Sequence, residues 1–244
     1  MKTLPKWLTA FVAIALIGAT PATADHHENA EEAADPWTGY RAHGTEPFWS
    51  LSITENRLSI EHAGDFSAEA ERRDRTSPWP GMVFISQSEN PGGRDFIVLI
   101  DEKICNDGMA DMVWPHSVRV IVDGRLYRGC GGDSASLLAG EEWRVTSIAG
   151  EEVPATVGQT IQFDMEGGVS GNGGCNRFMG SYDLTAELSF GPIASTRRAC
   201  INPEISRFEN ALLGALGTIY GLDVSEEGVL TLQGPDGPAI IARR

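Results

Sequence analysis

The sequence predicts two small β-rich domains: an N-terminal all-β antiparallel barrel or sandwich, and a C-terminal α+β domain with one helix on an antiparallel sheet. Short apolar runs alternate with turns rich in Gly, Pro and Asn, which is typical of antiparallel strands. Apolar residues at helical spacing occur in one clear stretch, after Asn202-Pro203. Two of the four cysteines lie in each predicted domain.

The first 24 residues have the composition of a secretory signal peptide. Lys2 and Lys6 form a basic start, residues 7–17 are mainly apolar, and Ala22-Thr23-Ala24 is a small-residue cleavage site. The apolar run is too short to be a good membrane anchor, and the first cysteine lies too far downstream to accept a lipid there. We therefore expect cleavage after Ala24, a periplasmic mature chain and no membrane span once the signal is removed.

The mature chain is strongly acidic. Removing two lysines with the signal takes the formal charge from −15 to −17. Nucleic acids and anionic lipids favour basic patches, so we expect neither as a partner. Solubility accounts for such a charge. We expect a monomer that binds an envelope protein or a small ligand, and nothing in the sequence indicates a cofactor.

Residues 25–36 form an acidic stretch without large apolar side chains, which is typical of a disordered tail. Cleavage after Ala24 would place Asp25-His26-His27 at the new N-terminus. A terminal amine, two backbone amides and the third residue's imidazole can then supply four nitrogens in a plane, the geometry that suits Cu(II) or Ni(II). An ordinary polar leader is the alternative interpretation.

Residues 37–132 form the predicted all-β domain. A strand within Gly44–Thr54 has Phe48, Leu51 and Ile53 as its expected inward residues, and it turns at Glu55-Asn56 into a hairpin. No stretch of this domain has a convincing helical pattern. The other expected strands are 57–62, 81–88, 95–104, 116–124 and 125–130.

The loop Cys105–Asp111 places two acidic residues near a cysteine and a glycine. Two interpretations are open: a functional loop that binds a cation or a partner, and an Asx-type turn held by a bridge to Cys130. The spacing lacks the oxygen ligands and the terminal glutamate of a calcium loop. We favour the structural turn.

Residues 133–136 form a predicted linker, because they are flexible in composition and lack core residues. The α+β domain follows at 137–244, and its first strand, at 142–150, has Trp143, Val145 and Ser147 on one face. The other expected strands are 159–165, 181–184, 187–193, 218–224, 228–234 and 238–243.

One helix is expected in the second domain. Asn202 can cap it, Pro203 suits its first position, and Gly217 is suited to its end. The apolar face comprises Ile205, Phe208, Leu212 and Leu216. This face predicts that the helix packs on the sheet.

An even number of cysteines in an exported chain indicates disulfides. Three pairings are possible, and closeness in sequence favours Cys105–Cys130 and Cys175–Cys200. A thiol nucleophile or a metal site is the alternative, but the chain has no CxxC motif and no histidine close to Cys175.

A ligand site in the second domain would lie in the glycine-rich stretch Gly167–Cys200. Glycine lets the backbone approach a ligand closely, and Asn and Arg are directional donors. The candidate binding residues are Asn172, Asn176, Arg177 and Arg197. The alternative is that the asparagines shape turns and that the arginines are solvated or paired with acids.

Several motifs of the second domain occur in a characteristic order: LAGEEWRVTSIAG, SGNGGCNRFMGSYDL, LSFGPIASTRRAC, and FENALLGAL followed by YGLDV and LTL. With these motifs, residues 137–244 resemble the META domain family, also called HslJ-like. The resemblance implies a small α+β domain found mainly in bacterial envelope proteins, linked to stress and secretion, with no established enzyme activity. It supplies no catalytic residues. Arg197-Arg198 stands where many members have Arg-Met.

The first domain is similar to a partner domain of some uncharacterised envelope proteins. The residues that carry this weaker resemblance are GTEPFW at 44–49 and CNDGMADMVWPHSVRV at 105–120, with RGCGG at 128–132. It implies no function.

Three functions are compatible with these features. The first, which we favour, is a non-enzymatic, stress-related binding or protective module of the envelope. The second is an inhibitor of a basic cell-wall hydrolase, because opposite charge speeds encounter. The third is a hydrolase that uses residues such as Ser195 and His116, but the chain has neither a GxSxG motif nor a metalloprotease helix motif.

Overall fold

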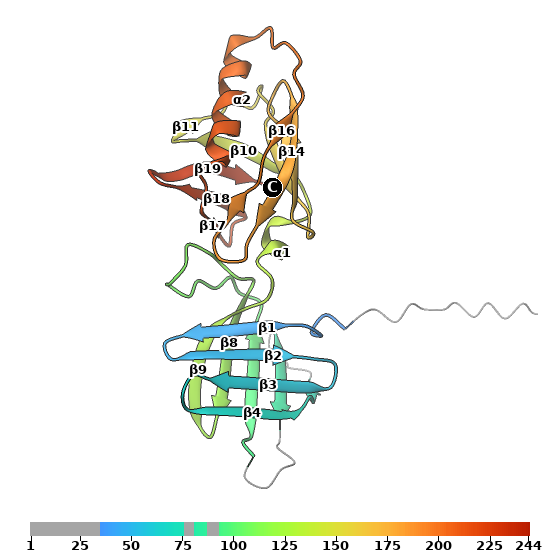
Figure 1. Ribbon diagram of the computed structural model, residues 1–244, viewed down its shortest axis with the longest axis vertical. Helices are drawn as coiled ribbons and strands as arrows, with labels where there is room; N and C mark the ends of the chain where they lie inside the picture. Colours follow the sequence, from blue (N-terminus) through green and yellow to red (C-terminus); the bar gives the residue numbers. More distant parts are fainter. Residues whose placement is uncertain (1–34, 76–80, 87–92) are drawn as a thin grey trace, which may run out of the picture. The chain divides into compact units, whose positions relative to one another are not determined.

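The computed structural model describes residues 35–75, 81–86 and 93–244 (Figure 1). The expected signal peptide with its cleavage point after Ala24 lies outside these ranges. So do the expected metal-binding residues Asp25, His26 and His27 and almost all of the acidic stretch at 25–36. Of the helices described, none is both long and apolar enough to cross a bilayer.

The first sheet contains nine described strands, each antiparallel to its neighbours, in the order β4-β3-β2-β1-β9-β8-β7-β6-β5. Tight turns join most consecutive strands, as the sequence predicts. The strands are β1 (Arg41–Thr45), β2 (Phe48–Ile53), β3 (Arg57–His62), β4 (Phe66–Glu71), β5 (Asp74–Arg75), β6 (Met82–Ser86), β7 (Phe96–Asp101), β8 (His116–Val122) and β9 (Arg125–Gly131).

One face of this sheet encloses a single hydrophobic core. Alternate residues of each strand point into it, such as Leu58 and Ile60 on β3 and Phe96 and Val98 on β7. Strands β1–β4 cross in front of β8 and β9 in Figure 1, so the curled sheet covers its own core. The prediction of an antiparallel all-β domain is confirmed.

The strand β2 corrects one predicted inward residue. Phe48 is 60% exposed, whereas Trp49, Leu51 and Ile53 are buried. Side chains alternate along a strand, so Phe48 cannot share a face with Leu51 and Ile53. The consequence is that an aromatic ring stands on the outer face of the sheet.

The second sheet has ten described strands. Eight follow the order β15-β14-β13-β12-β10-β19-β18-β17, while β11 pairs with β10 and β16 with β14. These strand pairs are antiparallel, as predicted for the α+β domain. The strands are β10 (Trp143–Ile148), β11 (Glu151–Glu152), β12 (Thr160–Phe163), β13 (Gly168–Asn172), β14 (Arg177–Asp183), β15 (Ser189–Phe190), β16 (Ala194–Ser195), β17 (Gly221–Val224), β18 (Val229–Gly234) and β19 (Gly237–Arg243).

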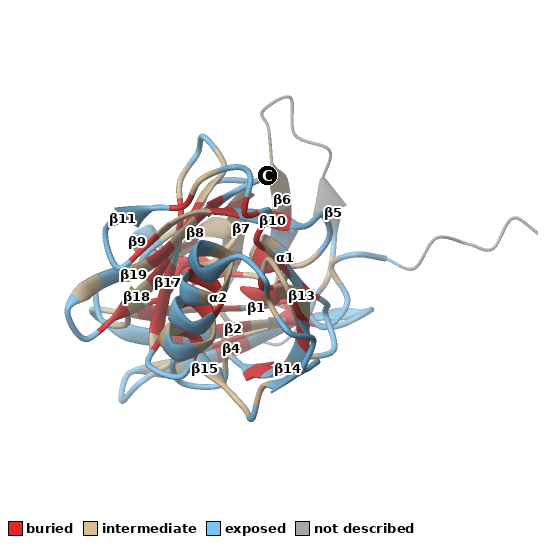
Figure 2. Cartoon of the chain, turned by 90° about the horizontal axis from the view of Figure 1, so that it is seen from above, coloured by how far each residue is buried: buried red, intermediate tan, exposed pale blue. Residues whose placement is uncertain are grey.

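The predicted helix is α2 (Pro203–Leu216), which packs on β10 and β19. The Asn202 side chain accepts a hydrogen bond from the Glu204 backbone N–H at 2.9 Å, and Gly217 is the C-cap residue, both as predicted. Phe208, Leu212 and Leu216 are buried against the sheet. Figure 2 shows the other side of α2 exposed to solvent, with buried strand residues behind it.

A β-bulge changes the inward face of β10. Trp143 and Val145 are buried as expected, but the pairing with β19 shifts between Val145 and Ser147. Ile148 therefore takes the buried position that simple alternation assigns to Ser147. One extra residue reverses which side chains of the strand face inward from that point on. The apolar pattern alone does not show where the extra residue lies.

Residues 133–136, the expected linker, contain the start of the short helix α1 (Ala135–Leu138). Ser134 and Ala135 are buried, and the Ser134 hydroxyl donates to the Val113 carbonyl at 2.7 Å. The low apolar content of this segment did not indicate this burial, because a serine with a backbone acceptor can be buried at little cost.

Candidate functional site

The outer face of β1, β2 and β3 carries two rows of polar side chains. In one row His43 pairs with Ser50, and Ser50 pairs with Glu61. The second row lies two residues along the strands and consists of Arg41, Ser52 and Ser59. Their neighbours Ala42, Leu51 and Ile60 face the core, so all six polar side chains project outward.

Two adjoining hollows lie over these rows, with volumes of about 460 Å³ and 470 Å³. Both are lined by His43, Ser50 and Glu61, so we treat them as one outer-face groove. Phe48 and Trp49 line one hollow, and Trp114 lines the other. The groove thus has a polar floor and at least one aromatic residue lining each hollow.

The loop between Cys105 and Trp114 forms the wall of the groove. Cys105 and Trp114 exchange two backbone hydrogen bonds, of 2.9 Å and 2.8 Å, which close the base of the loop. The predicted disulfide Cys105–Cys130 ties this base to β9, where Cys130 lies directly opposite His43 of β1. A disulfide and a strand pair therefore hold the wall beside His43.

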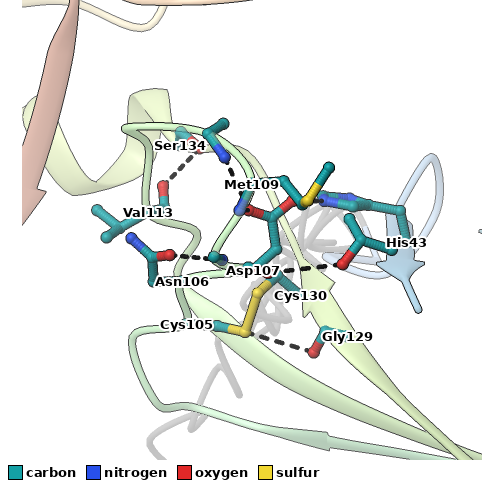
Figure 3. Close-up of polar contacts among 12 residues, drawn as sticks. His43, Cys105, Asn106, Asp107, Met109, Val113, Gly129, Cys130 and Ser134 are labelled. Atoms are coloured by element: carbon teal, nitrogen blue, oxygen red, sulfur yellow. Dashed lines mark hydrogen bonds and ion pairs between the residues drawn. A yellow bond between two sulfur atoms is a disulfide. The ribbon is translucent and has the colours of Figure 1, made fainter. Parts of the chain in front are cut away.

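Asp107 of this wall contacts His43 on β1, one of the three strands that form the floor of the groove (Figure 3). One of its oxygens, Oδ1, accepts hydrogen bonds from the backbone N–H groups of Met109 and Ala110 at 2.9 Å and 3.2 Å. The other, Oδ2, lies 3.4 Å from Nε2 of His43. The Asp107 side chain is 7% exposed, so it is held in one orientation.

Burial alone would raise the pKa of Asp107, but the hydrogen bonds from Met109, Ala110 and His43 outweigh it and lower the pKa. The carboxylate is therefore ionised at neutral pH and orients the imidazole. The His43 ring also meets Trp114 edge to face, with 4.7 Å between ring centroids. His43 is consequently fixed from two sides, while its side chain stays 36% exposed to a ligand.

The position of the Trp49 indole accounts for the absence of a side chain at Gly44 and Gly129. The indole N–H donates to the Arg128 carbonyl at 3.2 Å. A Cβ on Gly44 would lie 2.0 Å from the Trp49 Nε1, and one on Gly129 would lie 2.7 Å from the indole. The GTEPFW motif therefore brings an indole flat against two strands, and only glycine fits beneath it.

The arrangement is suited to binding. Asp107 and His43 form a carboxylate–imidazole pair, and Ser50 lies opposite His43. Within the part of the chain that the structure describes, no hydrogen bond joins the Ser50 hydroxyl to His43, a contact that a nucleophile and its base need. Ser195 and His116, the residues of the hydrolase alternative, lie on different sheets, in β16 and at the start of β8.

In the second domain, Asn176 is a buried structural centre. Its Nδ2 donates to Glu209 Oε1 at 2.7 Å and to the Arg198 carbonyl at 3.2 Å. Its Oδ1 accepts from the Thr196 hydroxyl at 2.9 Å and from the Arg198 N–H at 2.7 Å. With its amide satisfied in this way and 6% of the residue exposed, Asn176 has little capacity left for a ligand.

The other candidate residues of this domain do not form one site with Asn176. Asn172 stabilises a turn, since its Oδ1 accepts from the Gly174 N–H at 3.0 Å. Arg177 and Arg197 are exposed. The structure therefore brings Asn172 and Asn176 to one hairpin as turn and core residues, and leaves the two arginines on the surface.

Glu209 is the residue of this region that the sequence analysis missed. Its Oε2 accepts from the backbone N–H groups of Cys175 and Asn176 at 3.1 Å and 2.6 Å, and the residue is 7% exposed. Three ligand atoms, from Cys175, Cys200 and Glu209, lie within 4.8 Å of one another. The predicted disulfide Cys175–Cys200 uses both sulfurs, so they are not available as thiolate ligands.

The outer-face groove was not predicted because its floor residues meet only through strand register and Asp107 of its wall lies 64 positions from His43. The polar residues that alternate with Ala42, Leu51 and Ile60 are the available signal. The acidic loop near Cys105 was noted as a candidate, and its Asx-type turns are present, with Asn106 Oδ1 accepting from the Gly108 N–H at 2.7 Å. The contact of its Asp107 with His43 could be found only from the folded structure, because the two residues are 64 positions apart.

Comparison with known proteins supports the family resemblance of the second domain. A family model described as "META domain" matches residues 136–244. A search of curated proteins gives no match. Among solved structures, an NMR structure of a protein from Burkholderia xenovorans is 30% identical, covers 46% of this chain and 86% of its own, and has a TM-score of 0.38. A second NMR structure is 24% identical, with 46% and 96% covered and a TM-score of 0.38.

Proposed function

Residues 136–244 of the chain belong to the META domain family, and on this premise we propose that the protein is an exported, non-enzymatic binding protein of the cell envelope. A META domain indicates a stress-related or envelope-associated protein. The finer proposal is that the N-terminal sheet supplies the binding site and that this site is the outer-face groove. The protein would protect the envelope by holding a ligand, without chemical turnover.

The observation that carries this proposal is the fixed position of His43 in the groove. A binding site needs polar groups whose orientation is set before the ligand arrives. Asp107 and Trp114 orient His43, and strand pairing places Ser50 and Glu61 beside it. The groove therefore offers preorganised donors and acceptors on a rigid sheet.

Export is supported by the two disulfides, which fit a protein that folds outside the reducing cytosol. The signal-like first 24 residues support it further, and the mature chain would begin at Asp25. Mass spectrometry of the protein recovered from the periplasm checks the start point. A mature protein that begins elsewhere contradicts the expected cleavage after Ala24.

Co-sedimentation with isolated cell envelopes tests the proposed function. We expect the mature protein to pellet with envelopes and Glu61→Ala to lose most of this binding, because Glu61 is exposed and lines both hollows. The matched control is Glu226→Ala, which removes an exposed carboxylate from the turn between β17 and β18 of the second sheet. Equal pelleting of both variants, or turnover of ester or glycoside substrates, contradicts the proposal.

Inhibition of a basic cell-wall hydrolase is the second candidate. The formal charge of −15 and the exposed glutamates of β3 and β4, among them Glu61 and Glu69, favour encounter with a cationic enzyme. A lysozyme assay with added protein decides between the two. No inhibition at micromolar excess excludes this candidate.

A further inference from the structure

We infer that the ligand of the outer-face groove is a glycan strand, bound across β1, β2 and β3. This inference rests on the proposed function, since it names the ligand class of the same site. Its grounds are the shape of the groove, the mixture of its polar groups and the position of its aromatic residues.

The groove is long and open enough for a chain. Its two hollows of about 460 Å³ and 470 Å³ adjoin at His43, Ser50 and Glu61. Neighbouring strands lie about 4.8 Å apart and side chains on one face repeat about every 6.7 Å, so the two polar rows form a grid of regularly spaced contacts. Such a grid matches a polymer that repeats its polar groups.

The polar groups of the groove suit hydroxyl-rich ligands. The hydroxyls of Ser50, Ser52 and Ser59 can each donate and accept, as sugar hydroxyls do. Glu61 accepts hydrogen bonds, and Arg41 donates them. Glu69 of β4 lies opposite Ser59 at the end of the second row, so the outer face presents both acidic and basic groups among its hydroxyls.

Aromatic side chains line both hollows beside this polar floor. Phe48 lies at one hollow and is 60% exposed, and Trp114 lines the other. The apolar faces of sugar rings stack on flat aromatic surfaces, while their edges make hydrogen bonds. Phe48 lies outside the core, so its ring is accessible to a ligand in this hollow.

The test combines the mature protein with a panel of soluble neutral and amino-sugar oligosaccharides and one sulfated polysaccharide. We expect at least one oligosaccharide to bind saturably in isothermal titration calorimetry and to displace the protein from envelopes. Phe48→Ala and Glu61→Ala should each weaken binding at least tenfold. The matched controls are Leu126→Ala, which removes an exposed apolar side chain of β9, and Glu226→Ala, which removes an exposed carboxylate of the second domain.

The outcomes separate this inference from the proposed function. Envelope binding that depends on Glu61 but resists every oligosaccharide overturns the glycan ligand and leaves a binding protein for another envelope component. Binding only of a sulfated polyanion also overturns it, because the groove would then select charge. Loss of envelope binding altogether overturns the proposed function. Circular dichroism of Phe48→Ala and Glu61→Ala must match the unmodified protein, and folded variants that bind normally overturn the inference.

Discussion

Asn176 shows how one side chain can hold a loop in place. It joins Glu209 of α2 to the segment that ends at Cys200, and it is buried with its hydrogen bonds made inside the domain. A buried polar group of this kind is costly to lose, because its partners are left without donors or acceptors. The sequence identified Asn176 as important, but its role is in stability.

The substitution Asn176→Ala should destabilise the second domain by about 3 kcal/mol, since it removes donors from the buried Glu209 carboxylate. Arg177→Ala and Arg197→Ala should change stability by less than about 0.5 kcal/mol, because both side chains are exposed. Urea unfolding followed by circular dichroism measures both. Equal effects for Asn176→Ala and Arg177→Ala would contradict the structural role.

His116 gives stability a dependence on pH. Its Nδ1 is buried without a hydrogen-bond partner among the described residues, and burial lowers its pKa, partly offset by the charge of Glu102. A histidine whose pKa is lowered by folding favours the native state when neutral. Its contribution is present above the unfolded value of about 6.5 and is lost as pH falls below it.

We therefore expect the free energy of unfolding to decrease between pH 6.5 and pH 5, with His116 contributing at most about 1.4 kcal/mol per pH unit. His116→Gln should reduce this slope, whereas His43→Gln, at a partly exposed site, serves as the control. Urea titrations at several pH values give the slope. An unchanged slope in His116→Gln would show that other groups carry the acid sensitivity.

At the scale of elements, the loop between Cys105 and Trp114 and the helix α2 illustrate two kinds of predictability. The boundaries of α2 follow from local signals, because Asn202, Pro203 and Gly217 act on neighbouring backbone groups. The contact of the loop with His43 depends on residues 64 positions apart. Strands and turns were likewise predictable in part, whereas β1, β4 and the bulge in β10 lacked a distinct local signal.

The glycine-rich segment of β13 is absent from the expected strands. Gly168–Asn172 nevertheless forms a strand paired with β12 and β14. At Gly171 a Cβ would lie 2.1 Å from the Thr160 carbonyl oxygen. The glycine therefore permits close strand contact, a tertiary requirement that resembles a turn signal in sequence.

Removing the Cys105–Cys130 disulfide by Cys105→Ala with Cys130→Ala should loosen the wall of the groove. A loop closed over 25 residues contributes about 3 kcal/mol, and the Met109 and Ala110 amides should exchange faster because Asp107 is no longer held in place. Hydrogen exchange with mass spectrometry measures this.

The control is Cys175→Ala with Cys200→Ala, which removes a disulfide of the same sequence separation. It should lower overall stability but leave the exchange of Met109 and Ala110 close to that of the unmodified protein. Similar acceleration in both double variants would mean that the loop responds to global stability alone.

At the scale of the whole molecule, two hydrophobic cores and two disulfides account for the β-rich organisation that the sequence predicts. Composition and turn spacing indicated this organisation because they reflect burial and chain reversal. The outer-face groove could not be inferred in the same way. It depends on which polar residues stand side by side across strands, and sequence spacing does not contain that register.

Purified exported protein should contain no free thiol, and four thiols should appear after denaturation and reduction. Thiol titration with a chromogenic reagent counts them. Any free thiol in the oxidised, denatured protein would contradict the paired arrangement of Cys105 with Cys130 and of Cys175 with Cys200.

The wall of the groove continues directly into the second core. Met112 and Val113 are buried there, and the Asp111 carbonyl accepts a hydrogen bond from the Leu222 N–H at 2.9 Å. The groove and the META domain are therefore thermodynamically linked. We therefore expect a ligand that orders the wall to raise the melting temperature of the META domain, and a loosened META domain to bind that ligand less tightly.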